Sequence, residues 1–323
     1  MQRYRPAKSS ETPSFSGIKT YMRLPHVKTL DEVDFLIVGL PFDSASAARV
    51  GQRFAPQAIR ESSVYCKSYH PELDVDIFAH CSGVDYGDIN VVPGNTAKSL
   101  NNIRRELAAI IKKGIVPVCL GGEHTVVLPE LRAMQEAFGP VALVQFDAHH
   151  DCWDSYLDER ENQATPIRRG IEEGCILTDC SIQLGLRGPE YAADERRMVR
   201  ELGMELITAV ELHEMGMPKA VARIKARVKD APVFVTFDLD FLDAAYSPGT
   251  TIPMIGGFTT WQALQLIRGM RGLNFKGFDI VELIPSHDPG QITAIAAANI
   301  VWEFLGLIAC NNMARRQGGT SEN

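Results

Sequence analysis

Cysteine pairs and an apolar leader are both missing from this sequence. The seven cysteines are scattered and odd in number, and no two of them form a C-x-x-C pair. The first ten residues, MQRYRPAKSS, lack the apolar core of a secretory signal peptide. These absences argue against a disulfide scaffold or a cysteine-bound metal, and they predict a cytoplasmic protein with free thiols.

An excess of basic charge is missing as well. The net charge is −7, which gives no support to binding of nucleic acid or of an anionic membrane surface. The longest apolar stretch, residues 292–310, contains Asn299 and Glu303, so we expect a buried helix and no membrane span. No linker, repeat or low-complexity block divides the chain. We therefore predict a polar N-terminal arm over residues 1–20 and a single domain over residues 21–323.

The sequence does contain a regular alternation of short apolar runs and longer amphipathic ones. The predicted strands cover residues 34–41, 114–122, 141–148, 181–187, 204–212, 232–240 and 275–283. The predicted helices cover residues 97–114, 218–230 and 260–272, besides the C-terminal one. This alternation is typical of an α/β fold whose parallel sheet is covered by helices on both faces.

Acidic and histidine side chains follow three of these strands. They are His124 in GGEHT, Asp147, His149 and Asp151 in QFDAHHD, and Asp238 and Asp240 in FDLD. If strand geometry continues into QFDAHHD, its alternate residues point to one face, and the carboxyl ends of parallel strands meet at one edge. Carboxylates gathered there repel one another unless divalent cations neutralise them. Nitrogen and oxygen ligands without cysteine suit two ions such as Mn²⁺, Ni²⁺, Co²⁺ or Zn²⁺.

These motifs resemble those of the ureohydrolase family, which includes arginases and agmatinases. Further similar segments are residues 39–60, 165–174, 183–188 and 279–285, and the resemblance is closest to agmatinases, guanidinobutyrases and guanidinopropionases. It implies a three-layer α/β/α sandwich around a mostly parallel sheet of about eight strands, with two divalent ions, Mn²⁺ or Ni²⁺, per chain. The implied ligands are His124, Asp147, Asp151 and Asp238 for one ion, and Asp147, His149, Asp238 and Asp240 for the other.

The resemblance also implies an activity. Such an amidinohydrolase cleaves the C–N bond of a small cationic guanidino compound with a hydroxide that bridges the two metals, and it releases urea or a urea-like product and an amine. Asp151 would transfer the proton. Glu282, at the end of the strand FDIVEL, would pair with the planar guanidinium in bidentate fashion. The implied assembly is a trimer or a hexamer.

The segments that would face the substrate depart from the family pattern. Relatives carry a histidine where this chain has Gln163, our third candidate catalytic residue, and an amide cannot titrate. Thr251–Ile252 replaces the usual Gly-Thr. The loop 152–162 carries an excess of acids together with Trp153 and Tyr156, which we take as candidate substrate contacts because aromatic rings attract cationic or alkylated groups.

Three interpretations of these departures stay open. The chain hydrolyses agmatine or a guanidino acid despite them, or it hydrolyses an N-alkylated guanidine or a biguanide such as metformin, either alone or as one subunit of a heteromer. The third is a low-activity partner subunit of a paralogous ureohydrolase. Deacetylases with a single zinc resemble this fold, but six candidate ligands at three strand ends favour two metals.

Overall fold

The computed structural model describes residues 4–8 and 10–318. Its strands are β1 (Phe35–Gly39), β2 (Tyr69–His70), β3 (Val75–Asp76), β4 (Gly83–Asp88), β5 (Val116–Leu120), β6 (Ala142–Phe146), β7 (Ile182–Leu186), β8 (Glu205–Thr208), β9 (Pro232–Asp238) and β10 (Asn274–Val281). Within the described chain, eight of them form a parallel sheet in the order β4-β1-β5-β10-β9-β6-β7-β8, while β2 and β3 form a separate antiparallel pair.

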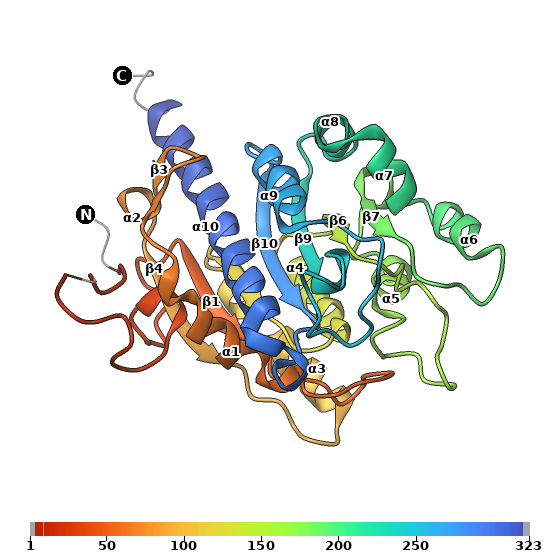
Figure 1. Ribbon diagram of the computed structural model, residues 1–323, viewed down its shortest axis with the longest axis horizontal. Coiled ribbons are helices and arrows are strands. Elements are labelled where there is room, and N and C mark those ends of the chain that lie inside the picture. The colour runs from red at the N-terminus through yellow and green to blue at the C-terminus, as the bar shows by residue number, and fades with distance from the viewer. Residues whose placement is uncertain (1–3, 9, 319–323) are drawn as a thin grey trace.

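Helices cover both faces of this sheet (Figure 1). One layer contains α1 (Ala55–Ser62), α2 (Ile77–His80), α7 (Ala209–Met215), α8 (Met217–Val228), α9 (Thr260–Gly269) and α10 (Ile292–Gly318). The other contains α3 (Thr96–Ile111), α4 (Val127–Phe138), α5 (Pro166–Glu172) and α6 (Glu195–Glu201). The predicted α/β/α sandwich around a parallel sheet of about eight strands is therefore confirmed.

The two layers exist because each central strand is apolar on both sides. Along β1, Phe35 and Ile37 pack in the core beneath α10, whereas Leu36 and Val38 pack in the core beneath α3. Successive side chains of a strand point to opposite faces, so an uninterrupted apolar run requires a cover on each of them. The short runs in the sequence thus specify buried strands, and the amphipathic segments between them supply the covers.

One predicted strand is wrong in part, and one strand of the sheet was missed. The predicted strand 204–212 ends at Thr208, because the Thr208 side chain accepts a hydrogen bond from the amide of Glu211 and caps α7. The edge strand β4 was not predicted at all. Its sequence, GVDYGD, contains two glycines and two aspartates, which lack the apolar pattern of a buried strand.

The C-terminal apolar segment forms α10. By length and composition this helix could span a membrane, but 78% of its most apolar window is buried inside the protein. Glu303 on α10 is 1% exposed, and it pairs with Arg268 at 2.6 Å and with His70 at 2.9 Å. The helix is therefore a core element, as predicted. The predicted boundary between an N-terminal arm and the domain at residue 20 stays a prediction.

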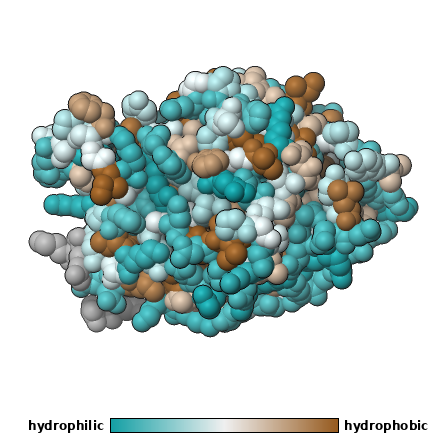
Figure 2. All heavy atoms as spheres, turned by 90° about the horizontal axis from the view of Figure 1, so that it is seen from below, coloured by the Kyte–Doolittle hydropathy of each residue, from teal (hydrophilic) through white to brown (hydrophobic). Residues whose placement is uncertain are grey.

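The carboxyl ends of the strands form the functional edge of the sheet. The arrowheads of β1 and β10 point to the bottom of Figure 1, and Figure 2 looks onto the molecule from that side. This face is mostly hydrophilic, with separate hydrophobic patches between the polar side chains. In open α/β sheets, ligands bind outside this edge.

A buried ion pair holds β4 in the sheet. Arg60 on α1 donates to the two carboxylate oxygens of Asp85 at 2.8 and 3.0 Å, and to Asp88 at 2.6 Å. Asp85 is fully buried and also accepts the amide of Tyr21. Burial lowers the pKa of Arg60, but the charges and hydrogen bonds of Asp85 and Asp88 outweigh it and raise this pKa. The two aspartates of β4 are therefore tolerated in the sheet because Arg60 on α1 neutralises their charges.

We expect Arg60→Met to destabilise the protein by about 3–5 kcal/mol, because it leaves the buried Asp85 carboxylate without a positive charge to neutralise it. Urea unfolding followed by circular dichroism measures this change. The control is Arg104→Met, which removes an exposed pair with Glu136 and should change the free energy of unfolding by at most about 1 kcal/mol. Equal effects of the two substitutions would contradict the assigned role of Arg60.

Candidate metal centre and substrate pocket

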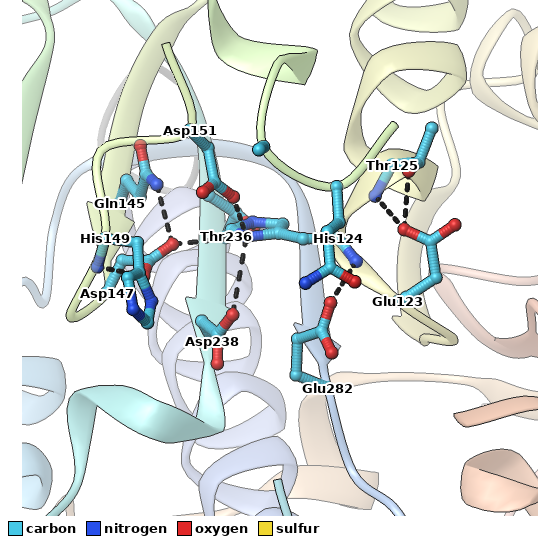
Figure 3. Close-up of polar contacts among 12 residues, drawn as sticks. Glu123, His124, Thr125, Gln145, Asp147, His149, Asp151, Thr236, Asp238 and Glu282 are labelled. Atoms are coloured by element: carbon cyan, nitrogen blue, oxygen red, sulfur yellow. Dashed lines mark hydrogen bonds and ion pairs between the residues drawn. The ribbon is translucent and has the colours of Figure 1, made fainter. Parts of the chain in front are cut away.

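Four neighbouring strands end side by side at the middle of the functional edge. In the sheet, β5 is followed by β10, β9 and β6. His124 follows β5, Glu282 follows β10, Asp238 ends β9 and Asp147 follows β6. Their side chains converge in Figure 3. His124 and Glu282 lie 158 positions apart in the chain, yet the amide of His124 donates to Glu282 Oε1 at 2.6 Å.

His124 presents one ring nitrogen to a hydroxyl and the other to carboxylates. Its Nε2 lies 2.9 Å from the hydroxyl of Thr236, which donates its only proton to Asp279 at 2.7 Å, so Nε2 carries a hydrogen and donates. Nδ1 then holds the lone pair. Among the described residues it has no hydrogen-bond partner, although it lies 2.8 Å from Asp151 Oδ2 and 3.1 Å from Asp147 Oδ2. A second partner that fixes the ring in this way is typical of a metal-binding histidine.

Asp147 joins this group of side chains to a second one. Its Oδ2 faces His124, while its Oδ1 accepts the amide of His149 at 2.6 Å and lies 3.7 Å from His149 Nδ1. The same Nδ1 lies 2.8 Å from Asp240 Oδ2. The described residues thus form two groups whose potential ligand atoms lie within 4.8 Å of one another, and Asp147 is common to both: His124, Asp147 and Asp151, and Asp147, His149 and Asp240.

The expectation that Asp147, His149 and Asp151 alternate along an extended strand is wrong. The strand β6 ends at Phe146, and Asp151 has a left-handed φ of 51°. A turn brings the Asp151 carboxylate to His124. Left-handed conformations of residues other than glycine are sparsely populated and cluster at functional sites.

Asp238 lies beside the two groups of described residues but is not a member of either. Its Oδ2 is 3.5 Å from His124 Nδ1, and its Oδ1 accepts the amide of Asp240 at 2.8 Å. Burial raises the pKa of Asp238 well above its usual value, and the charges of Asp240 and Asp147 raise it further. The carboxylates therefore repel one another at close range.

These side chains fit two divalent cations. Asp147 lies between two imidazoles, with its Oδ2 3.1 Å from His124 Nδ1 and its Oδ1 3.7 Å from His149 Nδ1. An unpaired imidazole lone pair, a shared carboxylate and further crowded carboxylates are the donor set that divalent ions such as Mn²⁺ or Ni²⁺ accept. Bound cations also remove the repulsion that raises the pKa of Asp238.

A cavity of about 390 Å³ opens over these groups, a size that suits a small-molecule ligand. The polar residues that line it include His124, His149, Asp151, Asp238, Asp240, Gln163, Thr251 and Glu282. The apolar and aromatic ones include Ala47, Ala48, Leu186, Ile252, Trp153, Tyr156 and Tyr191. Neither lysine nor arginine lines the cavity in the described part of the chain.

Glu282 is held by three donors from the protein. Its Oε1 accepts the amide of His124, and its Oε2 accepts the hydroxyl of Thr251 and, at 3.1 Å, the Nε2 of Gln52. Burial raises the pKa of Glu282 to about 7, and these hydrogen bonds oppose the rise. Glu282 also has a left-handed φ of 72°. These hydrogen bonds thus fix the Glu282 carboxylate in the lining of the cavity.

Gln163, Trp153 and Tyr156 line the cavity at its side. Gln163 Oε1 accepts the amide of Ala47 at 3.1 Å, so this side chain ties the loop before α1 to the pocket. The rings of Trp153 and Tyr156 stack, with centroids 6.0 Å apart and planes at 20°. All three therefore line the same cavity as the metal-binding groups, and their contact with a substrate stays a prediction.

Two acids of the loop 152–162 pair with arginines. Asp154 pairs with Arg169 at 2.8 Å and with Arg160 at 3.3 Å, and Glu161 pairs with Arg132 at 2.7 Å. The protein therefore neutralises the charges of these two acids itself. The aromatic residues are what the loop contributes to the cavity.

Sequence reasoning missed three residues around the cavity. Gln52 holds Glu282, Tyr191 contributes a third aromatic ring, and Glu195 binds both Trp153 and His150. No local pattern marks them, because each acts through contacts with residues that are distant in the chain.

Comparisons with known proteins agree on one family. The sequence model described as "Arginase family" matches residues 33–306. The chain is 37% identical to the guanidinobutyrase of Pseudomonas aeruginosa over 94% of this chain and 96% of that protein. It is 38% identical to the mitochondrial agmatinase of Gallus gallus over 90% of this chain and 85% of that protein. The structure of the proclavaminate amidinohydrolase from Streptomyces clavuligerus superposes with a TM-score of 0.89 at 34% identity, over 93% of this chain and all of that one.

We expect the purified protein to bind two divalent ions per chain, counted by elemental mass spectrometry after dialysis. Loss of a residue that only supports a ligand weakens metal binding by about 10- to 100-fold, so Asp147→Asn should weaken both sites by at least that much. His149→Ala should leave one ion, because His149 belongs to one group alone. Asp154→Asn, an exposed carboxylate outside both groups, is the control. An Asp147→Asn variant that retains two ions would contradict the shared position of Asp147.

Proposed function

Since the chain belongs to the arginase family, whose enzymes hydrolyse C–N bonds of guanidino compounds, we propose that it cleaves such a bond above two metal ions and releases urea, or a urea-like product, and an amine. The observation that supports this proposal most is the pair of histidine–carboxylate groups sharing Asp147 on the floor of the cavity. His124, Asp147, Asp151 and Asp238 would hold one ion, and Asp147, His149, Asp238 and Asp240 the other.

The chemistry that the two ions supply when bound is polarisation of a water molecule, whose pKa falls from about 15.7 to about 7. The residues of the chain then bind the substrate and move the protons. Asp151 lines the cavity, and its Oδ2 faces His124, so its other oxygen is free to accept a proton from the attacking water. The same carboxyl can deliver that proton to the leaving nitrogen.

Glu282 would bind the guanidinium. A carboxylate has about four lone-pair positions, and His124, Thr251 and Gln52 occupy three of those of Glu282. The remaining position, on Oε1, allows one hydrogen bond from the substrate together with the attraction between opposite charges. We therefore replace the expected bidentate pairing by a single charge-assisted hydrogen bond.

Gln163 would contribute a contact without a titrating group. Its amide lines the cavity and its Oε1 accepts from Ala47. The amide can donate a hydrogen bond to substrate, but it cannot carry a proton. Proton transfer in this chain therefore depends on Asp151.

The distal end of the substrate would be uncharged or cationic. A carboxylate inside the cavity would find neither lysine nor arginine among the described lining residues, whereas aromatic rings accept alkyl and cationic groups. This lining favours agmatine or an N-alkylated guanidine over guanidino acids, and a biguanide of the metformin type is the second candidate for the same reason. The relatives named for guanidino acids and for agmatine leave this choice open.

The assembly, the metal and the compartment remain predictions. We propose a trimer or hexamer, alone or with a paralogous subunit, that uses Mn²⁺ or Ni²⁺ in the cytoplasm. Light scattering of the purified chain gives its mass. A chain that binds two ions and yet releases urea only after co-expression with a paralogue would support the partner-subunit interpretation.

The substrate panel for metal-loaded protein contains agmatine, guanidine, dimethylguanidine, dimethylbiguanide, 4-guanidinobutyrate and 3-guanidinopropionate, with urea and amine release as readouts. We expect kcat/KM to be roughly tenfold or more higher for agmatine or an alkylated compound than for the guanidino acids, because a buried unpaired polar group is unfavourable by about 1–3 kcal/mol. Preferred turnover of a guanidino acid would contradict the assigned specificity. Arg49→Gln would then test whether that exposed residue, next to Ala48 of the lining, binds the carboxylate.

Glu282→Gln should lower kcat/KM for the best substrate by about 10- to 100-fold, because a hydrogen bond to a charged group contributes about 1.5–3 kcal/mol. Urea release at several substrate concentrations measures the change. Glu161→Gln, which alters a glutamate outside the cavity lining, should leave kcat/KM within about twofold of the original value. Equal kcat/KM for the Glu282 variant and the unmodified protein would exclude Glu282 as the guanidinium partner.

A further inference from the structure

One side of the cavity is an aromatic wall made of Trp153, Tyr156 and Tyr191. Trp153 lies in the middle, with its ring centroid 6.0 Å from that of Tyr156 and 5.3 Å from that of Tyr191. All three line the same cavity as the metal-binding groups. Tyr191 is 85% exposed, so the wall extends from the interior of the cavity to its mouth.

A single carboxylate holds the middle ring of this wall and the backbone at Tyr191. Glu195, the first residue of α6, is 8% exposed. Its Oε2 accepts the indole Nε1–H of Trp153 at 3.1 Å and the ring Nε2 of His150 at 3.0 Å. Its Oε1 accepts the amides of Tyr191 at 2.8 Å and Ala192 at 3.1 Å. One side chain therefore connects the loop after β6, the loop after β7 and α6.

The position of the ring hydrogen of His150 agrees with its hydrogen bond to Glu195. Its Nδ1 accepts the amide of Cys152 at 2.9 Å, so the hydrogen of the neutral ring is on Nε2 and points to Glu195. His150 stands between His149 and Asp151 in the chain. The contact with Glu195 thus turns the His150 ring away from the metal-binding groups while those neighbours face them.

The four hydrogen bonds use the full acceptor capacity of Glu195. A carboxylate offers about four lone-pair positions, and each is occupied by a donor of the protein. Glu195 therefore has no position left for a substrate cation. Its effect on a substrate can only pass through the side chains that it holds.

We propose that Glu195 is a positioning residue that sets substrate specificity, because it fixes the aromatic wall against which the substituent of the guanidino substrate packs. This inference rests on the proposed function. The substituent that such a wall accepts is an alkyl or alkylammonium group, which binds to the faces of the rings. The reacting guanidinium carbon lies at the other end, over Asp151 and Glu282, and does not contact the wall.

The test is Glu195→Gln, with Glu201→Gln on the same helix as the matched control, because Glu201 is exposed and pairs with Arg197. Glutamine retains one acceptor oxygen and presents an amide donor where two donors of the protein converge. We expect KM for the best substituted substrate to rise by roughly 5- to 30-fold, the range of a cation–π contact, with kcat and the kcat/KM for unsubstituted guanidine within about threefold. An equal loss of kcat on both substrates, with KM unchanged, would overturn the proposal in favour of an effect on the metal-binding loop.

A second readout does not depend on activity. Subtraction of the tryptophan fluorescence of each matching Trp153→Phe protein isolates the emission of Trp153 from that of the other two tryptophans. With Glu195→Gln we expect a red shift and faster quenching by acrylamide, because the indole loses its partner and gains water. Unchanged emission together with unchanged KM would overturn the proposal. If the unmodified protein hydrolyses no guanidino compound, the proposed function fails. The proposed role of Glu195 in substrate specificity then fails with it. The fluorescence still shows whether Glu195 holds Trp153.

The same bond can be removed from its other end if Glu195→Gln does not fold. Trp153→Phe keeps an aromatic ring, smaller than the indole, but removes the N–H that donates to Glu195, whereas Trp153→Ala removes the aromatic ring as well. We expect KM to rise in both, more in the alanine variant, and we expect the effects of Glu195→Gln and Trp153→Ala on KM to be less than additive. A Trp153→Phe protein with the KM of the unmodified chain would show that the tie to Glu195 is not needed.

Discussion

The burial of several carboxylates at one edge of the sheet is the constraint on which the rest of the structure depends. Asp147, Asp238, Asp240 and Glu282 are each at most 4% exposed, so bulk water contributes little to the solvation of their charges. The chain meets this requirement with backbone amides of the adjoining loops, which donate to Asp147, Asp238, Asp240 and Glu282. The loops after the strands are therefore shaped by the acids that they carry, including the left-handed backbone at Asp151 and Glu282.

Hydrogen bonding separates these acids by role. Glu195 accepts four bonds from the protein and is complete. Glu282 accepts three and keeps one position for a ligand, and Asp151 faces a bare imidazole nitrogen. A carboxylate that the protein satisfies supports its surroundings, whereas one left incomplete in a cavity is available for a metal ion or a substrate.

The metal-binding side chains and the specificity side chains stand on different kinds of backbone. The former stand at the ends of three central strands, β5, β9 and β6, whose positions are fixed by the sheet. The latter lie on the loops 43–53, 152–163 and 188–194, which Gln52, Gln163 and Glu195 tie down. Loops tolerate substitution better than the elements they connect. A change of substrate at an unchanged metal centre is therefore the variation that this arrangement allows most readily.

Much of the architecture was determined by local sequence. The apolar runs and amphipathic segments predicted seven of the sheet strands and four of the covering helices, α3, α8, α9 and α10, because burial on both faces leaves a clear pattern. The motifs at three strand ends predicted which residues would gather, since parallel strands end at a common edge. Only the tertiary structure supplied β4, whose aspartates are acceptable because Arg60 reaches them from α1. It also decided that Asp151 reaches His124 by a turn, that arginines pair with Asp154 and Glu161, and that Gln52 and Glu195 hold the pocket. Those contacts join residues up to 230 positions apart, and no periodicity along the chain records a hydrogen bond between side chains that meet only after folding.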